Sequence, residues 1–124
     1  MLSNFGELAG IHDIQFEDDT SVIRLRLEDK HRNHMGVAHG GLMATLADMA
    51  MGAAAHRHAQ RPLVTVEMKL SYMRPGFGGS LVAKGRMLKK GEHLLFASCT
   101  IYDDKGQEAL AALGTYMMVE ELKG

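Results

Sequence analysis

The sequence predicts an α+β fold in which an antiparallel sheet wraps around one long helix. Three observations indicate this class. Residues 40–58 are rich in Ala, Leu and Met and contain no proline, which favours a helix. Several other stretches alternate apolar and polar residues, as half-buried strands do. With 124 residues, 46% of them hydrophobic and 23% charged, the chain is long enough to bury the core of a single domain spanning 1–124.

The segments before the helix give weaker signals. Residues 2–9 are expected to form a short helix, and residues 12–17 a first strand. Over residues 23–27, Ile and Leu alternate with charged residues, which predicts a half-buried strand. A polar loop is expected at 29–35.

The segments after the start of the helix are mostly strands. The helix is expected to end in the basic run 56–58, whose positive charges suit the negative pole of the helix dipole, and Pro62 stops it. Alternating patterns then predict four strands, namely 64–73, 80–89, 93–102 and 108–119. A hairpin turn is expected at 103–106, before the last strand.

The predicted helix has almost no polar face, so we expect it to be buried on all sides. One small sheet covers only part of such a helix, and a second copy of the chain is the simplest cover for the rest. Asp48 is the exception in this apolar setting. Burying an unpaired carboxylate is costly, so Asp48 is expected to be paired or used in chemistry. Gly41, Thr45, Asp48 and Gly52 share one stripe of the helix, which is small and polar enough to admit a ligand or a partner.

The helix is expected to begin at His39-Gly40-Gly41, where backbone amides have no partner inside the helix. Such amides can polarise a carbonyl whose oxygen becomes negative during attack, although an ordinary glycine pair at the start of a helix is the alternative. Gly41 and Asp48 are about 10.5 Å apart along a helix axis, too far for both to reach the same reacting atoms. A two-fold dimer that places Asp48 of one chain opposite Gly40 of the other solves this problem and also covers the helix.

The composition argues against several classes of partner. Fourteen Lys and Arg against fifteen Asp and Glu give a net charge of −1 without a charged block, so nucleic acid is not expected. No stretch approaches the ~18 apolar residues of a membrane span, and the N-terminus does not resemble a signal peptide. The single cysteine, Cys99, is expected to be a buried strand residue in a reducing compartment. A cytoplasmic protein that does not bind membranes is therefore predicted.

Residues 33–41, Asn-His-Met-Gly-Val-Ala-His-Gly-Gly, and 44–48, Ala-Thr-Leu-Ala-Asp, resemble the signature of hotdog-fold acyl-CoA thioesterases of the phenylacetate-degradation (PaaI-like) type. Residues 64–75 resemble the strand that follows the central helix in that family. The joint spacing of the Asn, the His-Gly-Gly and the Asp is the specific part, and the similarity covers nearly the whole chain. The resemblance implies a hotdog fold, homodimers that form the active site and pair into tetramers, and hydrolysis of an acyl-CoA to a free acid and CoA.

The resemblance also implies roles for individual residues. Asp48 is the catalytic carboxylate, either as general base or as nucleophile, and the Gly40 amide polarises the thioester carbonyl. Asn33 helps to hold the carbonyl or the water, and Thr65 matches a hydroxyl residue that orients the water. His39 completes the motif.

Two of these residues have structural alternatives. Asn33 is also a common residue for capping a turn. Thr65 alternates with Val64 and Val66 and so falls on the same strand face as Glu67 and Lys69, which is equally well explained as the solvent-exposed face.

Substrate-binding residues are less well defined by the sequence. Gly41, at the helix N-terminus, is expected to contact the substrate, and cations near the mouth of the site are candidates for the CoA phosphates, namely Arg74, Arg86, Lys89 and Lys90. No cofactor is expected, because thioester hydrolysis needs only a base, a water and a polarised carbonyl. No metal is expected either, because no cysteine or acidic ligand joins the three nearby histidines, His31, His34 and His39, at a recognisable spacing.

Other functions fit the same fold. Five methionines are expected either to line an adaptable pocket for medium-chain or aromatic acyl groups or to pack the core, namely Met43, Met49, Met51, Met68 and Met73. A hotdog hydratase or dehydratase is one alternative, although the histidine motif of those enzymes has a different context. A non-catalytic acyl-CoA-binding oligomer is the other, because a fold does not guarantee a function.

Overall fold

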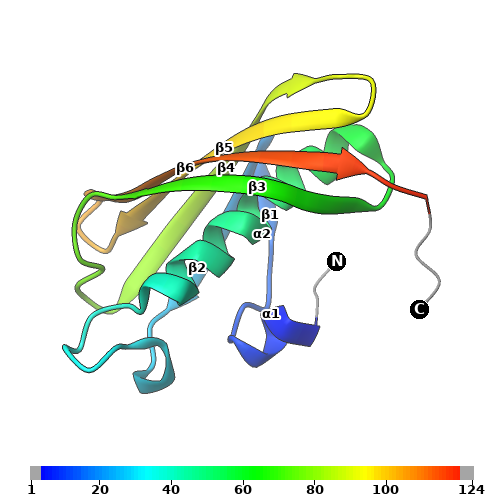
Figure 1. The fold of residues 1–124 in the computed structure, drawn as a ribbon. Coiled ribbons are helices and arrows are strands. Elements are labelled where there is room, and N and C mark those ends of the chain that lie inside the picture. Colours follow the sequence, from blue (N-terminus) through cyan, green and yellow to red (C-terminus); the bar gives the residue numbers. More distant parts are fainter. Residues whose placement is uncertain (1–3, 121–124) are drawn as a thin grey trace.

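The computed structural model describes residues 4–120 and contains a six-stranded antiparallel sheet wrapped around one long helix (Figure 1). The helices are α1 (Asn4–Leu8) and α2 (Gly40–Ala59), with a 3-10 turn, η1, at Asp29–His31. The strands are β1 (Gln15–Glu17), β2 (Thr20–Arg26), β3 (Leu63–Tyr72), β4 (Ser80–Lys90), β5 (Leu94–Asp103) and β6 (Glu108–Met118). The predicted fold class is confirmed.

The strand order in the sheet is β1-β2-β4-β5-β6-β3, and each neighbouring pair is antiparallel. The helix α2 links β2 to β3, which three other strands separate, so it must cross the sheet, and Figure 1 shows it lying along one face. Among the described strands, β3 is paired with β6 alone and forms a border of the sheet.

One side of α2 packs tightly on the sheet. Its fully covered residues are Met43, Leu46, Ala47, Ala50, Met51, Ala54 and Ala55. Near the middle of α2, the backbone of the helix lies close to the strands β2 and β4. The Ser21 hydroxyl on β2 donates a hydrogen bond of 2.6 Å to the Ala50 carbonyl, and Gly85 on β4 leaves no space for a Cβ beside that carbonyl. Cys99 on β5 is 3% exposed and carries a free thiol, which confirms the predicted buried strand residue.

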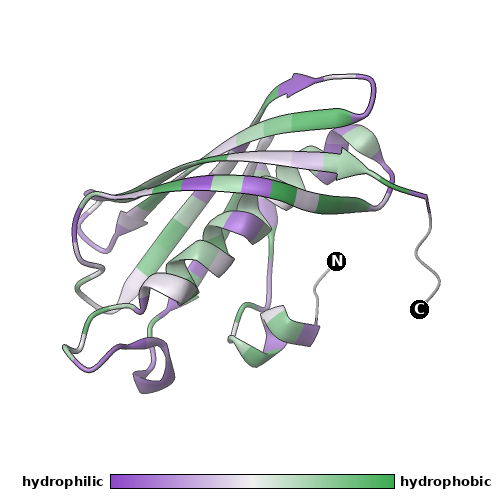
Figure 2. Cartoon of the chain, in the orientation of Figure 1, coloured by the Kyte–Doolittle hydropathy of each residue, from purple (hydrophilic) through white to green (hydrophobic). Residues whose placement is uncertain are grey.

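The single chain does not bury α2 on all sides, so the expected cover by a second copy stays a prediction. The side that faces away from the sheet is only partly covered, and its residues are Leu42, Ala44, Thr45, Asp48, Met49, Gly52 and Ala53. Figure 2 shows that α2 carries few strongly hydrophilic residues along most of its length. The described part of the chain therefore leaves a largely apolar helix surface only partly covered, because a single sheet contacts only one side of a helix.

The element boundaries follow the predictions most closely in α2. That helix ends at Ala59 and is capped by Gln60, which has a left-handed backbone (φ 53°), donates its N–H to the His56 carbonyl and lies two residues before Pro62. The first strand is shorter than the predicted 12–17, because only three residues of β1 pair with β2. The predicted helix 2–9 begins outside the described residues. In the described part of the chain, no helix is long and apolar enough to span a bilayer.

Candidate active site

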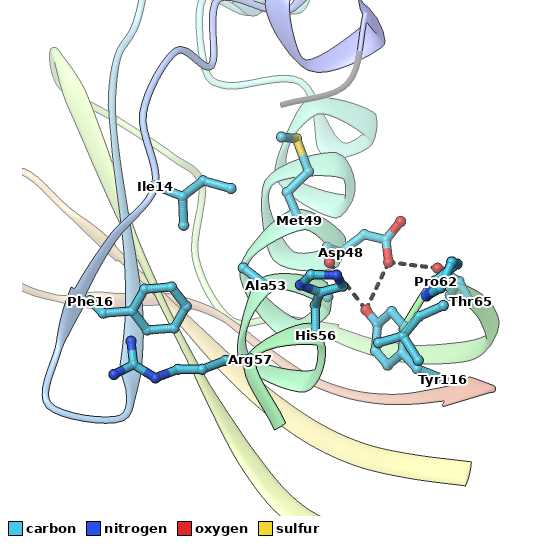
Figure 3. A pocket seen from close by; sticks show the side chains of 12 residues that line it. Ile14, Phe16, Asp48, Met49, Ala53, His56, Arg57, Pro62, Thr65 and Tyr116 are labelled. Carbon is cyan, nitrogen blue, oxygen red and sulfur yellow. Dashed lines mark hydrogen bonds between the residues drawn. The ribbon is translucent and has the colours of Figure 1, made fainter. Parts of the chain in front are cut away.

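Asp48 lies on the open side of α2, at the wall of a cavity of about 600 Å³ (Figure 3). Asp48 is partly exposed, in contrast to Ala47 and Ala50, which are buried on the sheet side of the same helix. Apolar side chains form most of the remaining wall, namely Ile14, Phe16, Met49, Ala53, Pro62 and Leu63. An ionisable group at the edge of an apolar cavity is a typical setting for catalysis or binding.

Thr65 reaches Asp48, because its hydroxyl donates a hydrogen bond of 2.9 Å to Asp48 Oδ1. The interpretation that Thr65 shares the solvent-exposed face with Glu67 and Lys69 is therefore wrong. A β-bulge between Thr65 and Glu67 shifts the alternation by one residue, with Val66 as the extra residue. The bulge places Thr65 on the helix side of the sheet, the side on which Met68 and Leu70 pack against the core.

Tyr116 on β6 is a site residue that the sequence analysis missed. Its hydroxyl donates a hydrogen bond of 2.7 Å to Asp48 Oδ1 and lies 3.2 Å from the Asp48 backbone carbonyl. Tyr116 is 2% exposed, and burial raises the pKa of its phenol well above the ordinary value, with the Asp48 charge as a further cause. The signal available in the sequence was weak, since a tyrosine in a strand is ordinarily part of the core.

The N-terminus of α2 is capped by His39. The Gly41 amide donates a hydrogen bond of 2.8 Å to His39 Nδ1, so this amide is already paired and does not face an open site. None of the described residues accepts a hydrogen bond from the Gly40 amide, which is partly exposed. The Tyr72 hydroxyl donates to the Gly40 carbonyl at 2.6 Å and holds this residue in place. Of the two glycine amides, only that of Gly40 is available to a ligand.

Asn33 organises the loop before α2. Its side-chain oxygen accepts hydrogen bonds from the amides of Met35 (2.9 Å) and Val37 (3.3 Å), which is the turn-capping arrangement. The side-chain NH₂ group of Asn33 makes no hydrogen bond to any of the described residues and can still donate to a ligand. Asn33 therefore has a structural role in this chain and retains a free donor.

A family model described as the thioesterase superfamily matches residues 35–110, which is more than half of the chain. The chain belongs to the thioesterase superfamily. The matched region contains all of α2, β3, β4 and β5. Together with the sheet around α2, it identifies the protein as a thioesterase with the hotdog fold.

Relatives of this thioesterase carry corresponding names. A putative esterase of Pseudomonas aeruginosa is 37% identical over 94 residues, which are 73% of this chain and 70% of the relative. Acyl-coenzyme A thioesterase 13 of Homo sapiens is 33% identical over 97 residues, 77% of this chain and 69% of the relative. A solved structure of a Bacillus halodurans protein with CoA superposes with a TM-score of 0.85 at 26% identity, and covers 98% of this chain and 82% of that one.

The cations predicted to bind the substrate are dispersed over the thioesterase. Arg74, beyond the end of β3, donates to the Glu108 carbonyl and lines a separate hollow. Arg86 lies on the face of β4 opposite to Gly85, and thus away from α2. Lys90 reaches the His58 carbonyl at the C-terminal end of α2, at 3.4 Å. One chain therefore does not bring these three cations together, and their contact with substrate stays a prediction.

Two residues at the C-terminal end of α2 line the cavity instead. The sequence indicates only that His56 and Arg57 are favourable charges at the helix end, but both belong to the cavity wall. Arg57 stacks on the Phe16 ring, 4.3 Å from its centroid, and its Nε lies 3.5 Å from Asp19 Oδ1. The cavity therefore extends from a carboxylate to a guanidinium.

The predicted histidines and methionines are distributed differently. His31 is buried, with Nδ1 accepting from the Glu28 amide and Nε2 2.6 Å from the Ala9 carbonyl. Within residues 4–120 no group of three or more His, Cys, Asp or Glu side chains is placed to hold a metal. Among the five methionines only Met49 lines the cavity, whereas Met43 and Met51 are in the core and Met73 is exposed.

Proposed function

We propose that this thioesterase hydrolyses the thioester bond of an acyl-CoA to give the free acid and CoA, with Asp48 as the catalytic carboxylate. The observation that carries the proposal is the position of Asp48, which combines a fixed carboxylate with an adjoining apolar cavity. A carboxylate in this position can act in two ways. As a general base it takes a proton from the attacking water, and as a nucleophile it forms an anhydride that water then cleaves.

The Gly40 amide is proposed to polarise the thioester carbonyl. It lies at the positive end of α2 and is free of partners among the described residues, so it can donate to an oxygen that becomes negative during attack. The side-chain NH₂ of Asn33 assists in holding the carbonyl or the water, and Thr65 holds Asp48. His39 fixes the helix N-terminus at which Gly40 is located.

The active site is proposed to form between two chains. Gly40 and Asp48 of one helix are separated by about 12 Å along the axis, so they do not reach the same thioester. The open side of α2 and the unpaired edge of β3 lie next to each other, and Val66 on that edge is 53% exposed. A two-fold dimer covers both surfaces and brings Asp48 of one chain to Gly40 of the other. We propose further that such dimers pair into tetramers.

The acyl group is proposed to be a medium-length chain or an aromatic ring. The cavity beside Asp48 is lined mainly by apolar side chains, and Met49 gives it an adaptable wall. The human relative is named as an acyl-coenzyme A thioesterase, and the Bacillus halodurans structure contains CoA, which supports an acyl-CoA substrate. The reaction needs no cofactor. We propose that the enzyme is cytoplasmic, and the free, buried thiol of its single cysteine, Cys99, supports a reducing compartment.

A panel of CoA thioesters with aliphatic and aromatic acyl groups tests this function. We expect the wild-type protein to hydrolyse at least one of them, and Asp48→Asn to lower kcat by roughly 10³-fold or more without changing the oligomeric state, because the amide cannot accept a proton. Asp18→Asn is the matched control. Asp18 is exposed in the β1–β2 turn at φ 55°, where asparagine is equally well tolerated, so this variant should retain full activity.

Two results would contradict the proposal. If the wild-type protein cleaves no thioester in the panel but binds acyl-CoA, the non-catalytic binding oligomer is the better description. If Asp48→Asn retains the activity of the wild type, another residue carries the reaction.

A further inference from the structure

The two oxygens of the Asp48 carboxylate have different surroundings. Oδ1 accepts one hydrogen bond from the Thr65 hydroxyl at 2.9 Å and another from the Tyr116 hydroxyl at 2.7 Å. No described residue donates to Oδ2. Figure 3 shows both hydrogen bonds converging on one oxygen of Asp48, while the other oxygen points away from Thr65 and Tyr116. The carboxylate is therefore held at one end and free at the other.

Tyr116 acts in this arrangement as a donor. Because burial raises its pKa, the phenol keeps its proton across the pH range in which an enzyme works. It has a single proton, and the distance to Oδ1 is shorter than the distance of 3.2 Å to the Asp48 backbone carbonyl. A hydrogen bond from a neutral donor to a carboxylate is among the stronger hydrogen bonds in proteins. Tyr116 thus fixes the orientation of the carboxylate.

The sheet places the two hydroxyl groups side by side. Thr65 and Tyr116 are direct partners in the pairing of β3 with β6, and the bulge at Val66 turns Thr65 to the same side as Tyr116. Gly114, two residues before Tyr116, makes room for the ring, because a Cβ at Gly114 would lie 2.9 Å from Tyr116 Cε2. On the other side of the ring, a Cβ added at Gly52 on α2 would make only an ordinary contact of 3.7 Å with Tyr116 Cε1. The glycine at position 114 and the bulge at Val66 therefore position this pair of donors.

We propose that Tyr116 is a positioning residue of the thioesterase reaction, which together with Thr65 holds Oδ1 of Asp48 and leaves Oδ2 as the reacting oxygen. The proposal rests on the proposed function. If Asp48 is a general base, Oδ2 takes a proton from water as the water oxygen bonds to the thioester carbon. The carbon–sulfur bond then breaks, and Oδ2 returns the proton to the CoA thiolate. If Asp48 is a nucleophile, Oδ2 bonds to that carbon, the thiolate leaves, and water cleaves the resulting anhydride.

Loss of one donor lets the carboxylate rotate away from the attacking geometry. Small displacements of a catalytic group reduce rates by up to roughly 10²-fold, while substrate binding, which uses other contacts, is little affected. If Tyr116 had only a structural role, loss of its hydroxyl would instead weaken substrate binding and folding together. The separation of kcat from KM therefore distinguishes positioning from packing.

The test uses Tyr116→Phe, which keeps the buried ring and removes only the hydroxyl. We expect kcat to fall by roughly 10- to 100-fold, with KM and the Kd for a non-hydrolysable thioether analogue of the substrate within about twofold of the wild type. Tyr102→Phe is the matched control, because Tyr102 lies on β5, and its hydroxyl makes no hydrogen bond to any described residue. The control should retain the wild-type kcat.

Two variants of Thr65, on β3, test the second hydrogen bond to Asp48 Oδ1. Thr65→Val should lower kcat by a similar factor, and Thr65→Ser, which keeps the hydroxyl, should restore it. If Tyr116→Phe does not fold, the Thr65 variants still test the proposal, because Thr65 is exposed and its replacement disturbs the core less.

Three results would overturn the proposal. The first is a kcat within about twofold of the wild type in Tyr116→Phe while Asp48→Asn is inactive, which removes this inference but leaves the proposed function intact. The second is an equal loss of analogue binding and kcat in Tyr116→Phe. The third is a wild-type protein that hydrolyses no CoA thioester, which removes the proposed function and this inference together.

Discussion

Single side chains in the site differ in whether their polar groups are already satisfied. Asp48 Oδ1 and the Gly41 amide each have partners of their own, whereas no described residue pairs with Asp48 Oδ2 or the Gly40 amide. Asp48 and Gly40 are both partly exposed, so the free acceptor and the free donor can each reach a ligand. The proposed thioester hydrolysis requires one acceptor and one donor of this kind.

Cys99 provides a prediction at the same scale. Burial raises the pKa of its thiol from 9.0 to about 12. A group with a raised pKa keeps its proton in the folded state after the unfolded chain has lost it. The folded state is therefore progressively destabilised as the pH rises from 9 towards 12. Urea unfolding of the wild type and Cys99→Ala should show a steeper loss of stability in the wild type over this range.

The same property can be checked by chemical labelling. Near neutral pH the folded protein should not react with a thiol reagent, and denaturant should make Cys99 reactive, because the thiolate is the reactive form. Rapid labelling of the native protein would contradict the raised pKa of Cys99. So would an equal loss of stability with pH in the wild type and in Cys99→Ala over the alkaline range.

Asp48 could be found from the sequence because a single carboxylate in an apolar helix is conspicuous. The side of the sheet on which Thr65 lies could not be predicted. Strict alternation places Thr65 with Glu67 and Lys69, and the bulge that reverses its direction is not marked by glycine or proline. Tyr116 could not be found either. Its link to Asp48 depends on the pairing of two strands that are distant in sequence and on the space left by Gly114.

At the level of elements, α2 was predictable to within one residue, since Ala, Leu and Met without an interrupting proline favour a helix and Pro62 follows its end. The long strands were predictable from their alternating patterns. The short strand β1 was not, because a border strand with three paired residues has little pattern to detect. The open side of α2 was indicated by the small, polar stripe that includes Thr45, Asp48 and Gly52, since most of the rest of the helix is apolar.

The packing of α2 on the sheet depends on a glycine in β4. A Cβ at Gly85 would overlap the Ala50 carbonyl and lie 2.6 Å from the Ser21 hydroxyl. We expect Gly85→Ala to lower the free energy of unfolding by on the order of 3 kcal/mol, because backbone atoms cannot move aside as a flexible side chain does. Denaturant unfolding measures this loss.

Gly79→Ala is the control for that experiment. An added Cβ at Gly79, just before β4, has no atom within 4 Å, so the free energy of unfolding should change by less than about 1 kcal/mol. Equal stabilities for the Gly79 and Gly85 variants would contradict the close approach of α2 to β4.

At the level of the whole molecule, the described part of one chain leaves two exposed surfaces that a second copy can cover. The strand β3 ends the sheet, and α2 presents a partly exposed apolar side next to it. The strand order itself was beyond sequence analysis, because β3 follows α2 in the chain but pairs with the last strand. That pairing brings Thr65 and Tyr116 to Asp48, and leaves Gly40 a distance of about 12 Å away along the helix.

The dimeric site can be tested with two defective chains. Asp48→Asn removes the carboxylate. Gly40→Pro removes the free amide at the first position of α2, where proline is well tolerated and where the preceding residue, His39, already has the extended backbone that proline requires. Each variant alone should be folded, oligomeric and inactive.

The decisive measurement is the activity of the two variants co-expressed in equal amounts. If Asp48 of one chain works with Gly40 of the other, half of the dimers are mixed and one of their two sites is intact, so about a quarter of the wild-type kcat should return. If both groups belong to one chain, each mixed dimer contains only defective sites. The absence of any recovery, with mixed dimers shown to be present, would contradict the shared site.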